Sequence, residues 1–444
     1  MNVSVAKTKA ETGLTEAFTA VESRLPGGNS VREQRRRAIG AFASLGLPHR
    51  RVEEWKYTDL RGLMKEALAP AVGAAAATSV EALEKALGPL AALNAVRVVF
   101  VNGAWSEALS RISGADGVEI KALGEALADA QDKVGENLIR LPREDDALSA
   151  LNTAFATDGA VVRVADDVTV ERPILLVFAR AGQDEKAITT RNVVSVGKGA
   201  KVTLVEAFVT LDGAADKVQS NTQTDIVIGD EAAVTHVKSV IDTGKAVHLA
   251  GCNAGIGADA SYRAFQFTVG TGLTRNQIFV TFNGEGSKLD CSGAFLAKGS
   301  EHVDTTLVVD HAVPGCESRE LYKGVMDDRA RGIFQGKVIV RQDAQKTDGK
   351  QMAQALMLSP DCEFDSKPEL EIYADDVICG HGSTVAEIDP TMIFYCMSRG
   401  IPEAEARALL IESFVGEAIE KVEDETVQEA LKQSARDWMN RRVD

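Results

Sequence analysis

The sequence predicts a mainly β protein whose core is a right-handed parallel β-helix, with α-helical domains before and after it. Three observations lead to this prediction. Short β-branched runs separated by Gly, Asp and Ala fill the chain from Val161 onward. A related segment recurs there at a slowly drifting period, and long helical periodicity is confined to the two ends of the chain. A double-sheet sandwich is the structural alternative, but it would not require a repeat.

The first region, residues 1–158, is predicted to be mainly helical. An amphipathic helix should stop at Gly46, a second should begin after Ser79 as its N-cap, and Gly159 stands where a third would have its C-cap. Trp55 and Tyr57 are expected to anchor a loop onto the next domain, because aromatic side chains usually bury their rings. The predicted helices cover residues 31–48, 79–93 and 145–160, and a short strand and turn covers residues 96–105.

The second region, residues 159–388, contains the repeat. Four segments share one form, an apolar residue followed by a small turn and a strand: VADDVTV, VGKGAKV, IGDEAAV and IGADASY, with FNGEGSK as a weaker fifth copy. Their second residues are 165, 197, 229, 257 and 283, so the copies lie 32, 32, 28 and 26 residues apart. Each coil of a β-helix has strand edges that only the next coil can pair. We therefore expect the copies to stack.

The third region, residues 389–444, returns to helical texture. Helices are expected over residues 402–422 and 425–439. We expect them to cap the open end of the solenoid and to offer a docking surface for a partner. Their predicted apolar face consists of Leu409, Leu410, Phe414, Ile419 and Val422.

Composition excludes several classes of function. The formal net charge of −16 over 444 residues makes nonspecific binding to nucleic acid or to an anionic membrane unlikely to be its role. No run of about 18 apolar residues predicts a membrane span, and the first residues have no signal-peptide pattern. The six cysteines are scattered without a C-x-x-C pair. This usage predicts a reduced, cytoplasmic protein whose metal ligands, if any, are brought together by folding or by a partner.

Catalytic motifs are missing from the sequence. It has no P-loop, nucleophile elbow, HExxH or dinucleotide-binding fingerprint, and its six histidines show no i,i+4 ligand spacing. The most unusual local feature is ICGHGSTVAEID at residues 378–389. In an extended strand Cys379 and His381 lie on one face, and the glycines beside them leave room for another backbone. A metal site, a catalytic pair and a tight turn all remain open for it.

A family resemblance bears on this choice. Residues 366–402, SKPELEIYADDVICGHGSTVAEIDPTMIFYCMSRGIP, resemble the C-terminal signature of the SufB/SufD family of iron–sulfur cluster assembly proteins. RRVEEWKYTDL at residues 50–60 and QDAQKTDGKQ at residues 342–351 resemble two further signatures of that family. The form of the C-terminal motif is closer to the SufD branch than to the SufB branch, which carries an acidic stretch where Gly380–Ser383 stands here.

The resemblance implies a β-helix between helical domains and a role in a scaffold complex, not an enzyme. It implies pairing through the β-helix with a SufB-like paralogue, and ATP hydrolysis by a SufC-like ABC ATPase bound to the C-terminal helices. A transient iron–sulfur cluster would be shared with the paralogue, with His381 as a tentative metal ligand and Cys379 at the same interface, and a contribution to iron acquisition is also implied. The residues expected to bind the ATPase are Arg399, Gly400, Ile401, Pro402, Leu409, Leu410 and Phe414.

Other interpretations stay open from the sequence. Participation of a reduced flavin in the complex is undecided, as is a homodimer of the isolated chain. A structural adaptor in which Cys379 and His381 only pack is one functional alternative. A β-helix enzyme acting on carbohydrate is another, less favoured because such enzymes are usually exported and line one face with aromatic residues, which make up only 5% here.

Overall fold

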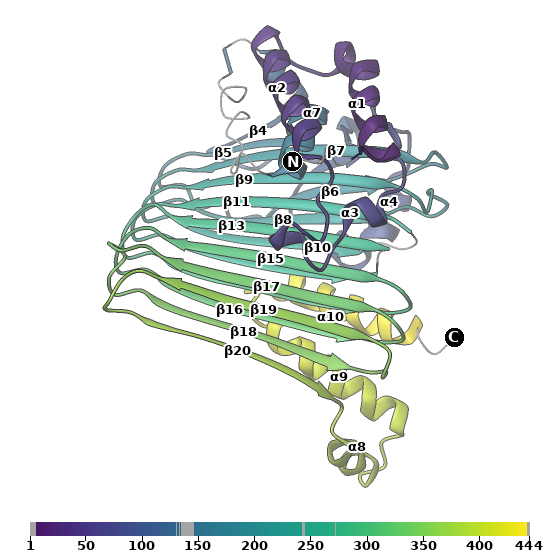
Figure 1. Ribbon diagram of the computed structural model, residues 1–444, viewed down its shortest axis with the longest axis vertical. Coiled ribbons are helices and arrows are strands. Elements are labelled where there is room, and N and C mark those ends of the chain that lie inside the picture. The colour runs from purple at the N-terminus through teal and green to yellow at the C-terminus, as the bar shows by residue number, and fades with distance from the viewer. Residues whose placement is uncertain are drawn as a thin grey trace.

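The computed structural model describes residues 6–129, 131–132, 134, 146–241, 245–270 and 272–441. Its centre is a solenoid of parallel strands, with helices at the N-terminal end and along one side (Figure 1). The prediction of a mainly β solenoid flanked by helices is confirmed. The helices before the solenoid strands are α1 (Lys9–Val21), α2 (Asn29–Leu45), α3 (Leu60–Leu63), α4 (Val80–Leu87), α5 (Leu123–Ala128) and α7 (Ala147–Phe155).

Each coil contributes one strand to each of two ten-stranded sheets. We call them the odd sheet and the even sheet, after the numbers of most of their strands. Neighbouring strands within a sheet are parallel, apart from the antiparallel pairs β2–β3 and β4–β5. The odd sheet contains β1 (Ala69–Pro70), β4 (Val118–Ala122), β5 (Ala160–Val164), β7 (Lys186–Val196), β9 (Gln219–Ile228), β11 (Val247–Ile256), β13 (Leu273–Phe282), β15 (His302–His311), β17 (Arg331–Val340) and β19 (Glu363–Ile372). The even sheet contains β2 (Val96–Val101), β3 (Ala104–Trp105), β6 (Ile174–Arg180), β8 (Lys201–Thr210), β10 (Ala233–Ile241), β12 (Ser261–Val269), β14 (Lys288–Ala297), β16 (Glu317–Met326), β18 (Asp348–Met357) and β20 (Ile378–Glu387).

The sequence repeat stacks one copy on the next. The backbone N–H of Gly197 donates to the carbonyl of Val164 at 2.9 Å, and the same bond joins Gly229 to Val196 at 2.8 Å in the following copy. The same backbone hydrogen bond joins the third copy to the fourth and the fourth to the fifth. A Cβ atom on Gly197 would lie 2.6 Å from the backbone nitrogen of Asp166. Glycine therefore recurs at this position because the backbones of successive coils approach too closely for a side chain.

Apolar side chains fill the space between the two sheets. The rings of Phe100, Phe178 and Phe208 stack at the same height on β2, β6 and β8, with centroids 5.1 and 4.7 Å apart. Parallel register repeats a side-chain type at one height, so each coil adds a layer to the same core. At about 25 cal/mol per Å² of buried apolar surface, each ring contributes a few kcal/mol.

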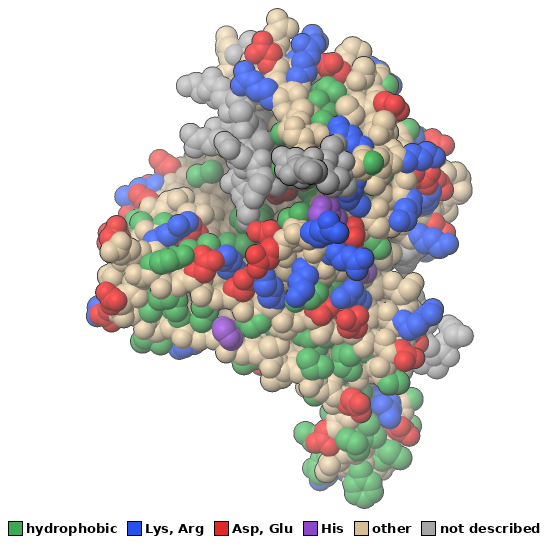
Figure 2. All heavy atoms as spheres, in the orientation of Figure 1, with side chains coloured by type: hydrophobic (Ala, Val, Ile, Leu, Met, Phe, Trp, Pro, Cys, Tyr) green, Lys and Arg blue, Asp and Glu red, His purple; other side chains and the backbone are tan. Residues whose placement is uncertain are grey.

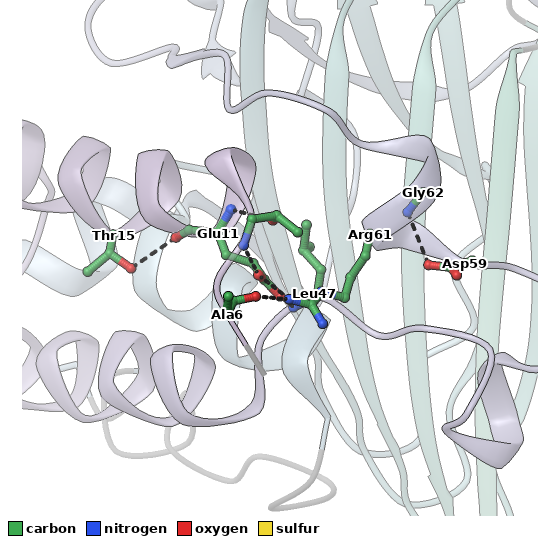
Figure 3. Close-up of polar contacts among 8 residues, drawn as sticks. Ala6, Glu11, Thr15, Leu47, Asp59, Arg61 and Gly62 are labelled. Atoms are coloured by element: carbon green, nitrogen blue, oxygen red, sulfur yellow. Dashed lines mark hydrogen bonds and ion pairs between the residues drawn. The ribbon is translucent and has the colours of Figure 1, made fainter. Parts of the chain in front are cut away.

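Buried polar groups fasten the N-terminal helices to each other. Glu11, near the start of α1, is 4% exposed and forms a capping box with Thr8. Its carboxylate also accepts the backbone N–H of Leu47 at 2.8 Å and pairs with the guanidinium of Arg61 at 3.1 Å (Figure 3). These hydrogen bonds lower the pKa of Glu11 although burial acts in the opposite direction. One carboxylate thus joins the start of α1, the residue after the C-cap of α2, and α3.

The predicted N-terminal elements are present, with one correction. Gly46 is the C-cap of α2, Ser79 is the N-cap of α4, and Trp55 is buried against the odd sheet. Gly159 is not the C-cap of α7, because that helix already ends at Phe155. Gly159 has φ +150°, and a Cβ there would lie 1.9 Å from the carbonyl oxygen of Arg191. It is required by close approach of two backbones.

The bounds of the elements bear on the domain prediction. β5 begins at Ala160 and β20 ends at Glu387, while β2, far earlier in the chain, pairs in parallel with β6. The even sheet therefore draws on residues before 159, and the division at 158/159 and 388/389 stays a prediction. Among the described residues, no helix combines the length and the apolar character needed to cross a membrane.

The C-terminal helices are α8 (Pro390–Met397), α9 (Glu403–Ile419) and α10 (Glu425–Arg441). The prediction that they cap the open end is wrong. α9 packs on β14 and β16, and α10 packs on β12, so both lie along the outer face of the even sheet. Their buried face contains Ile411, Val415, Ala418, Ile419 and Val422. Of the predicted apolar face, Ile419 and Val422 are buried, Leu410 and Phe414 are half-buried and Leu409 is exposed.

Candidate functional site

The strand that carries Cys379 and His381 is the last strand of the even sheet. In the described part of the chain, β20 pairs only with β18, so one edge has backbone groups free to bind another strand. The end of the odd sheet, β19, lies beside it. Large apolar side chains are exposed around these two strands, namely Ile372, Tyr373, Ile378 and Val385. A free edge flanked by exposed apolar side chains is typical of a surface that binds a protein.

Cys379 and His381 lie on the inner face of β20, as the two-residue spacing predicts. Cys379 stands opposite Gly349 and packs beside Val338 of the odd sheet. His381 stands opposite Gln351, whose amide reaches across to the carbonyl of Gly336 in the odd sheet. Because register partners in a parallel pair point to the same face, His381 is also directed to the inner side. The turn interpretation is therefore wrong, since both residues are inside a strand.

Their environments differ. His381 is exposed, whereas Cys379 is half-buried. Burial raises the pKa of the Cys379 thiol, and an interaction with the backbone of Gly349 offsets part of that rise. A thiol binds a metal as thiolate. Cys379 is thus held as a neutral thiol at neutral pH, and a cation must displace its proton.

The glycines beside these residues have different roles. A Cβ on Gly380 would meet nothing within 4 Å, so this position is open to the outside. A Cβ on Gly382 would lie 2.7 Å from Cε of Met352, the far end of an exposed and flexible side chain that can move aside. Gly380 fits the expectation of clearance for an approaching backbone more directly.

A cavity of about 480 Å³ lies on the outer face of these strands, where Arg319, Lys350 and Lys421 line it together with the backbone around Cys379 and His381. Two residues that sequence reasoning missed, Glu320 on β16 and Gln351 on β18, lie on the inner face in line with His381. Glu320, Gln351 and His381 are successive register partners, 31 and 30 residues apart. This spacing is close to the coil period and is the signal that would have found them.

The predicted partner-binding residues lie around the start of α9. Arg399 and Gly400 follow α8, with the Arg399 guanidinium 4.4 Å from the centre of the Tyr395 ring, and Pro402 is the N-cap of α9. Phe414 faces the sheet instead, where the ammonium of Lys323 lies 4.4 Å from its ring. The structure thus separates Phe414 from the exposed Leu409, while Ile401 and Leu410 are half-buried.

An exposed apolar patch on α8 was missed by the sequence analysis. Figure 2 shows hydrophobic side chains gathered on the protruding end of the molecule that α8 forms in Figure 1. Phe394 is 71% exposed. The apolar run PTMIFYCM of this helix was a signal for the patch, but an all-apolar run also fits a buried helix. The exposed members are Met392, Phe394, Tyr395 and Met397, with Leu409 of α9 nearby in sequence, and we call these five residues the α8 patch.

The remaining cysteines do not complete a ligand set. All six are free, and Cys252, Cys291, Cys316 and Cys362 are buried. Within the ranges that the structure covers, no three His, Cys, Asp or Glu side chains are arranged to hold a metal ion. The described chain presents a thiol and an imidazole on a free strand, and their role as metal ligands stays a prediction.

Comparisons with known proteins identify the family of this chain. Residues 178–414 match the family described as "SUF system FeS cluster assembly, SufBD core domain", and residues 9–176 match the "SufBD protein N-terminal region". An iron–sulfur cluster assembly SufBD family protein of Synechocystis is 30% identical, with 90% of this chain and 89% of that protein covered. The iron–sulfur cluster assembly protein SufD of Escherichia coli is 30% identical, with 87% and 88% covered, and SufD of Bacillus subtilis is 28% identical, with 65% and 66% covered. With the core model matching more than half of the chain, this protein belongs to the SufBD family of SUF-system iron–sulfur cluster assembly proteins.

Proposed function

We propose that this chain is a SufD-like subunit of a cytoplasmic scaffold that assembles iron–sulfur clusters and acquires iron for them. It pairs through the free end of its solenoid with a SufB-like paralogue and holds a SufC-like ABC ATPase at the α8 patch. The chain itself contributes surfaces and ligands, and the ATPase partner hydrolyses ATP. The observation that carries this proposal is the location of Cys379 and His381 on a terminal strand whose other edge is unpaired by any described part of the chain.

The free end supports pairing with another solenoid. β19 and β20 each have ten residues, and a paralogue with the same fold ends in similar strands. Edge-to-edge pairing would continue both sheets from one protein into the next and bury Ile378 and Val385. The same geometry permits a homodimer when the isolated chain is the only protein present.

Cys379 and His381 together form what we call the half-site, and its chemistry suits iron or a cluster that must later be released. A thiolate and an imidazole bind iron, and two ligands from one chain hold it less firmly than a closed set of four thiolates. Opening of the interface would separate the two halves of the ligand set. The six free cysteines fit a reducing compartment, which supports the cytoplasmic part of the proposal.

The α8 patch supports docking of the ATPase. Its side chains are exposed on a helix that protrudes beyond the sheets (Figure 2). Replacing Phe394 with serine should weaken binding of the ATPase at least tenfold and leave folding unchanged, because Phe394 has little to pack against in this chain. Leu68→Ser, at a buried apolar position, is the contrasting variant and should reduce stability. Equal ATPase affinity for wild type and Phe394→Ser, measured by calorimetry, would locate the docking surface elsewhere.

One observation favours a second candidate, a structural adaptor. His381 is exposed and the described residues hold no complete ligand set, as expected if the two side chains only pack at an interface. Co-purification with the SufB-like and SufC-like partners under anaerobic conditions separates the candidates. A brown complex with bound iron and sulfide supports the scaffold, and a colourless complex supports the adaptor. Flavin is measured in the same sample.

A further inference from the structure

Glu320 is a buried acid that the proposed half-site does not use. It lies on the inner face of β16 and is 3% exposed, and among the described residues neither carboxyl oxygen has a hydrogen-bond partner at normal geometry. The hydroxyl of Ser318, two residues earlier, pulls the pKa of Glu320 down but makes its own 3.0 Å hydrogen bond with His311. Burial has the larger effect and raises the pKa of Glu320 to about 8. A carboxyl group without a partner is costly in a protein interior and calls for an explanation.

The position of Glu320 gives that explanation. The side chains of Glu320, Gln351 and His381 follow one another on β16, β18 and β20 at the same height. Neighbouring strands are about 4.8 Å apart, so Glu320 lies roughly 10 Å from His381 along the column. Their side chains share the inner face with Cys379, whereas the cavity of about 480 Å³ lies on the outer face of the same strands. The acid thus stands two strands inside the half-site.

Gln351 stands between them with a second unsatisfied acceptor. It is 3% exposed, its amide nitrogen donates to the carbonyl of Gly336 at 3.4 Å, and its Oε1 has no partner among the described residues. The adjoining column has Gly349 at this height, where a Cβ would lie 3.6 Å from Sγ of Cys379 and 3.4 Å from Oγ of Ser318. The space at Gly349 thus lies beside the Cys379 thiol, while Gly336 of the odd sheet makes room for Gln351, since a Cβ there would lie 2.1 Å from its Oε1.

Buried oxygen acceptors without donors, next to an imidazole and a thiol, match the ligand preferences of a ferrous ion. We propose that Glu320 and Gln351 supply oxygen ligands for a divalent cation that enters behind His381 and Cys379, an inner position that receives iron before a cluster is built. Side-chain rotation completes the set, since no three of the described acidic, Cys and His side chains already surround one point. This inference rests on the proposed function, because it assigns the iron-handling role to additional residues of the same end.

The competing explanation for the buried carboxyl group is that Glu320 has a structural role only. A permanently neutral acid that fills space would tolerate replacement by glutamine, which has the same shape, without any effect on cations. The cation site requires a carboxylate, since a bound cation compensates the charge that burial otherwise disfavours. Cation affinity therefore separates the two explanations.

The test is titration of the full-length chain with Co²⁺, a spectroscopic substitute for Fe²⁺, under anaerobic conditions. The absorption of the cobalt complex reports thiolate and imidazole binding. The variants are Glu320→Gln, Gln351→Leu, Cys379→Ala and His381→Ala, and the matched control is Glu317→Gln, whose side chain is 48% exposed on the same strand. We expect Glu320→Gln to weaken Co²⁺ binding about ten- to a hundred-fold. Glu317→Gln should bind like wild type.

Each outcome has a defined meaning. Wild-type affinity in both Glu320→Gln and Gln351→Leu, with binding lost in Cys379→Ala and His381→Ala, overturns the inner position and leaves the proposed function intact. Affinity unchanged in all four variants, or no saturable binding by the wild type, overturns the inference and removes the support for metal handling by this chain. If Glu320→Gln does not fold, Gln351→Leu alone decides the inference.

Discussion

The ion pair between Arg275 on β13 and Asp304 on β15 provides a sharp test of how the N-terminal loop is held. The two residues are register partners on the outer face of the odd sheet, and both side chains are fully buried. Trp55 covers the pair, with the guanidinium of Arg275 4.6 Å from its ring centre. Arg275 also donates to the backbone carbonyl of Glu54 at 2.8 Å, and the hydroxyl of Thr58 donates to Asp304. The loop that contains Glu54, Trp55 and Thr58 is thus bound to the odd sheet by one buried ion pair.

Replacing Asp304 with asparagine keeps the shape and leaves the Arg275 charge uncompensated. Breaking one side of a buried pair costs about 3–5 kcal/mol. The matched control is Asp310→Asn on the same strand, since Asp310 pairs with Arg341 at 2.8 Å in an exposed setting where such pairs are worth about 0–1 kcal/mol. The assay is urea unfolding, combined with limited proteolysis of the loop around Glu54.

We expect the Asp304 variant to lose several kcal/mol and to be cleaved faster near Glu54, while the Asp310 variant stays close to wild type. Equal losses in the two variants would refute the reasoning, because burial would then not determine the cost. So would a loss below about 1 kcal/mol in the Asp304 variant.

Two further predictions concern pH and backbone clearance. Burial lowers the pKa of His302 and of His311 to about 4, below the value near 6.5 of an unfolded chain, so the folded state binds fewer protons. The folded protein keeps its full stability above pH 6.5 and loses stability as the pH falls toward 4, by roughly 2 kcal/mol per histidine at pH 5. In urea unfolding, His311→Asn should lose less stability between pH 7 and pH 5 than wild type. An equal loss would contradict the lowered pKa of His311. Gly159→Ala should be strongly destabilised because its Cβ would overlap a backbone carbonyl, whereas Gly380→Ala should unfold like wild type yet bind the SufB-like partner more weakly. Unchanged partner affinity of Gly380→Ala would remove Gly380 from the interface.

The solenoid was predictable because the same steric requirement returns once in every coil and so leaves a period in the sequence. Gly197 and Gly229 recur where successive backbones touch, and the strands between them are rich in β-branched residues. Helix ends at Gly46 and Ser79 were predictable for a different reason, since capping depends on a few adjacent residues. Gly159 was misassigned because a glycine after a helical segment also fits a C-cap, and the neighbouring strand that excludes a side chain is 32 residues away.

The position of the C-terminal helices was not predictable. Apolar spacing in α9 indicated a buried face but not the surface that covers it, and Leu409 and Phe414 ended on different sides. The candidate site was predictable only in part. Period-two alternation placed Cys379 and His381 on one face, whereas Glu320 joins them through parallel register, which is set by turn lengths that drift along the chain.

The central claim is that the free end of this solenoid is half of an iron–sulfur assembly site, and one measurement tests it most directly. Iron and acid-labile sulfide are quantified in the anaerobically reconstituted complex of this chain with the proposed SufB-like and SufC-like partners, for wild type, Cys379→Ala and His381→Ala. His381 is exposed and Cys379 is half-buried at the last strand, so each substitution removes few contacts within this chain and the variants should assemble normally. The account predicts that His381→Ala assembles into the complex and loses most of its cluster. Wild-type iron and sulfide in both variants would contradict it.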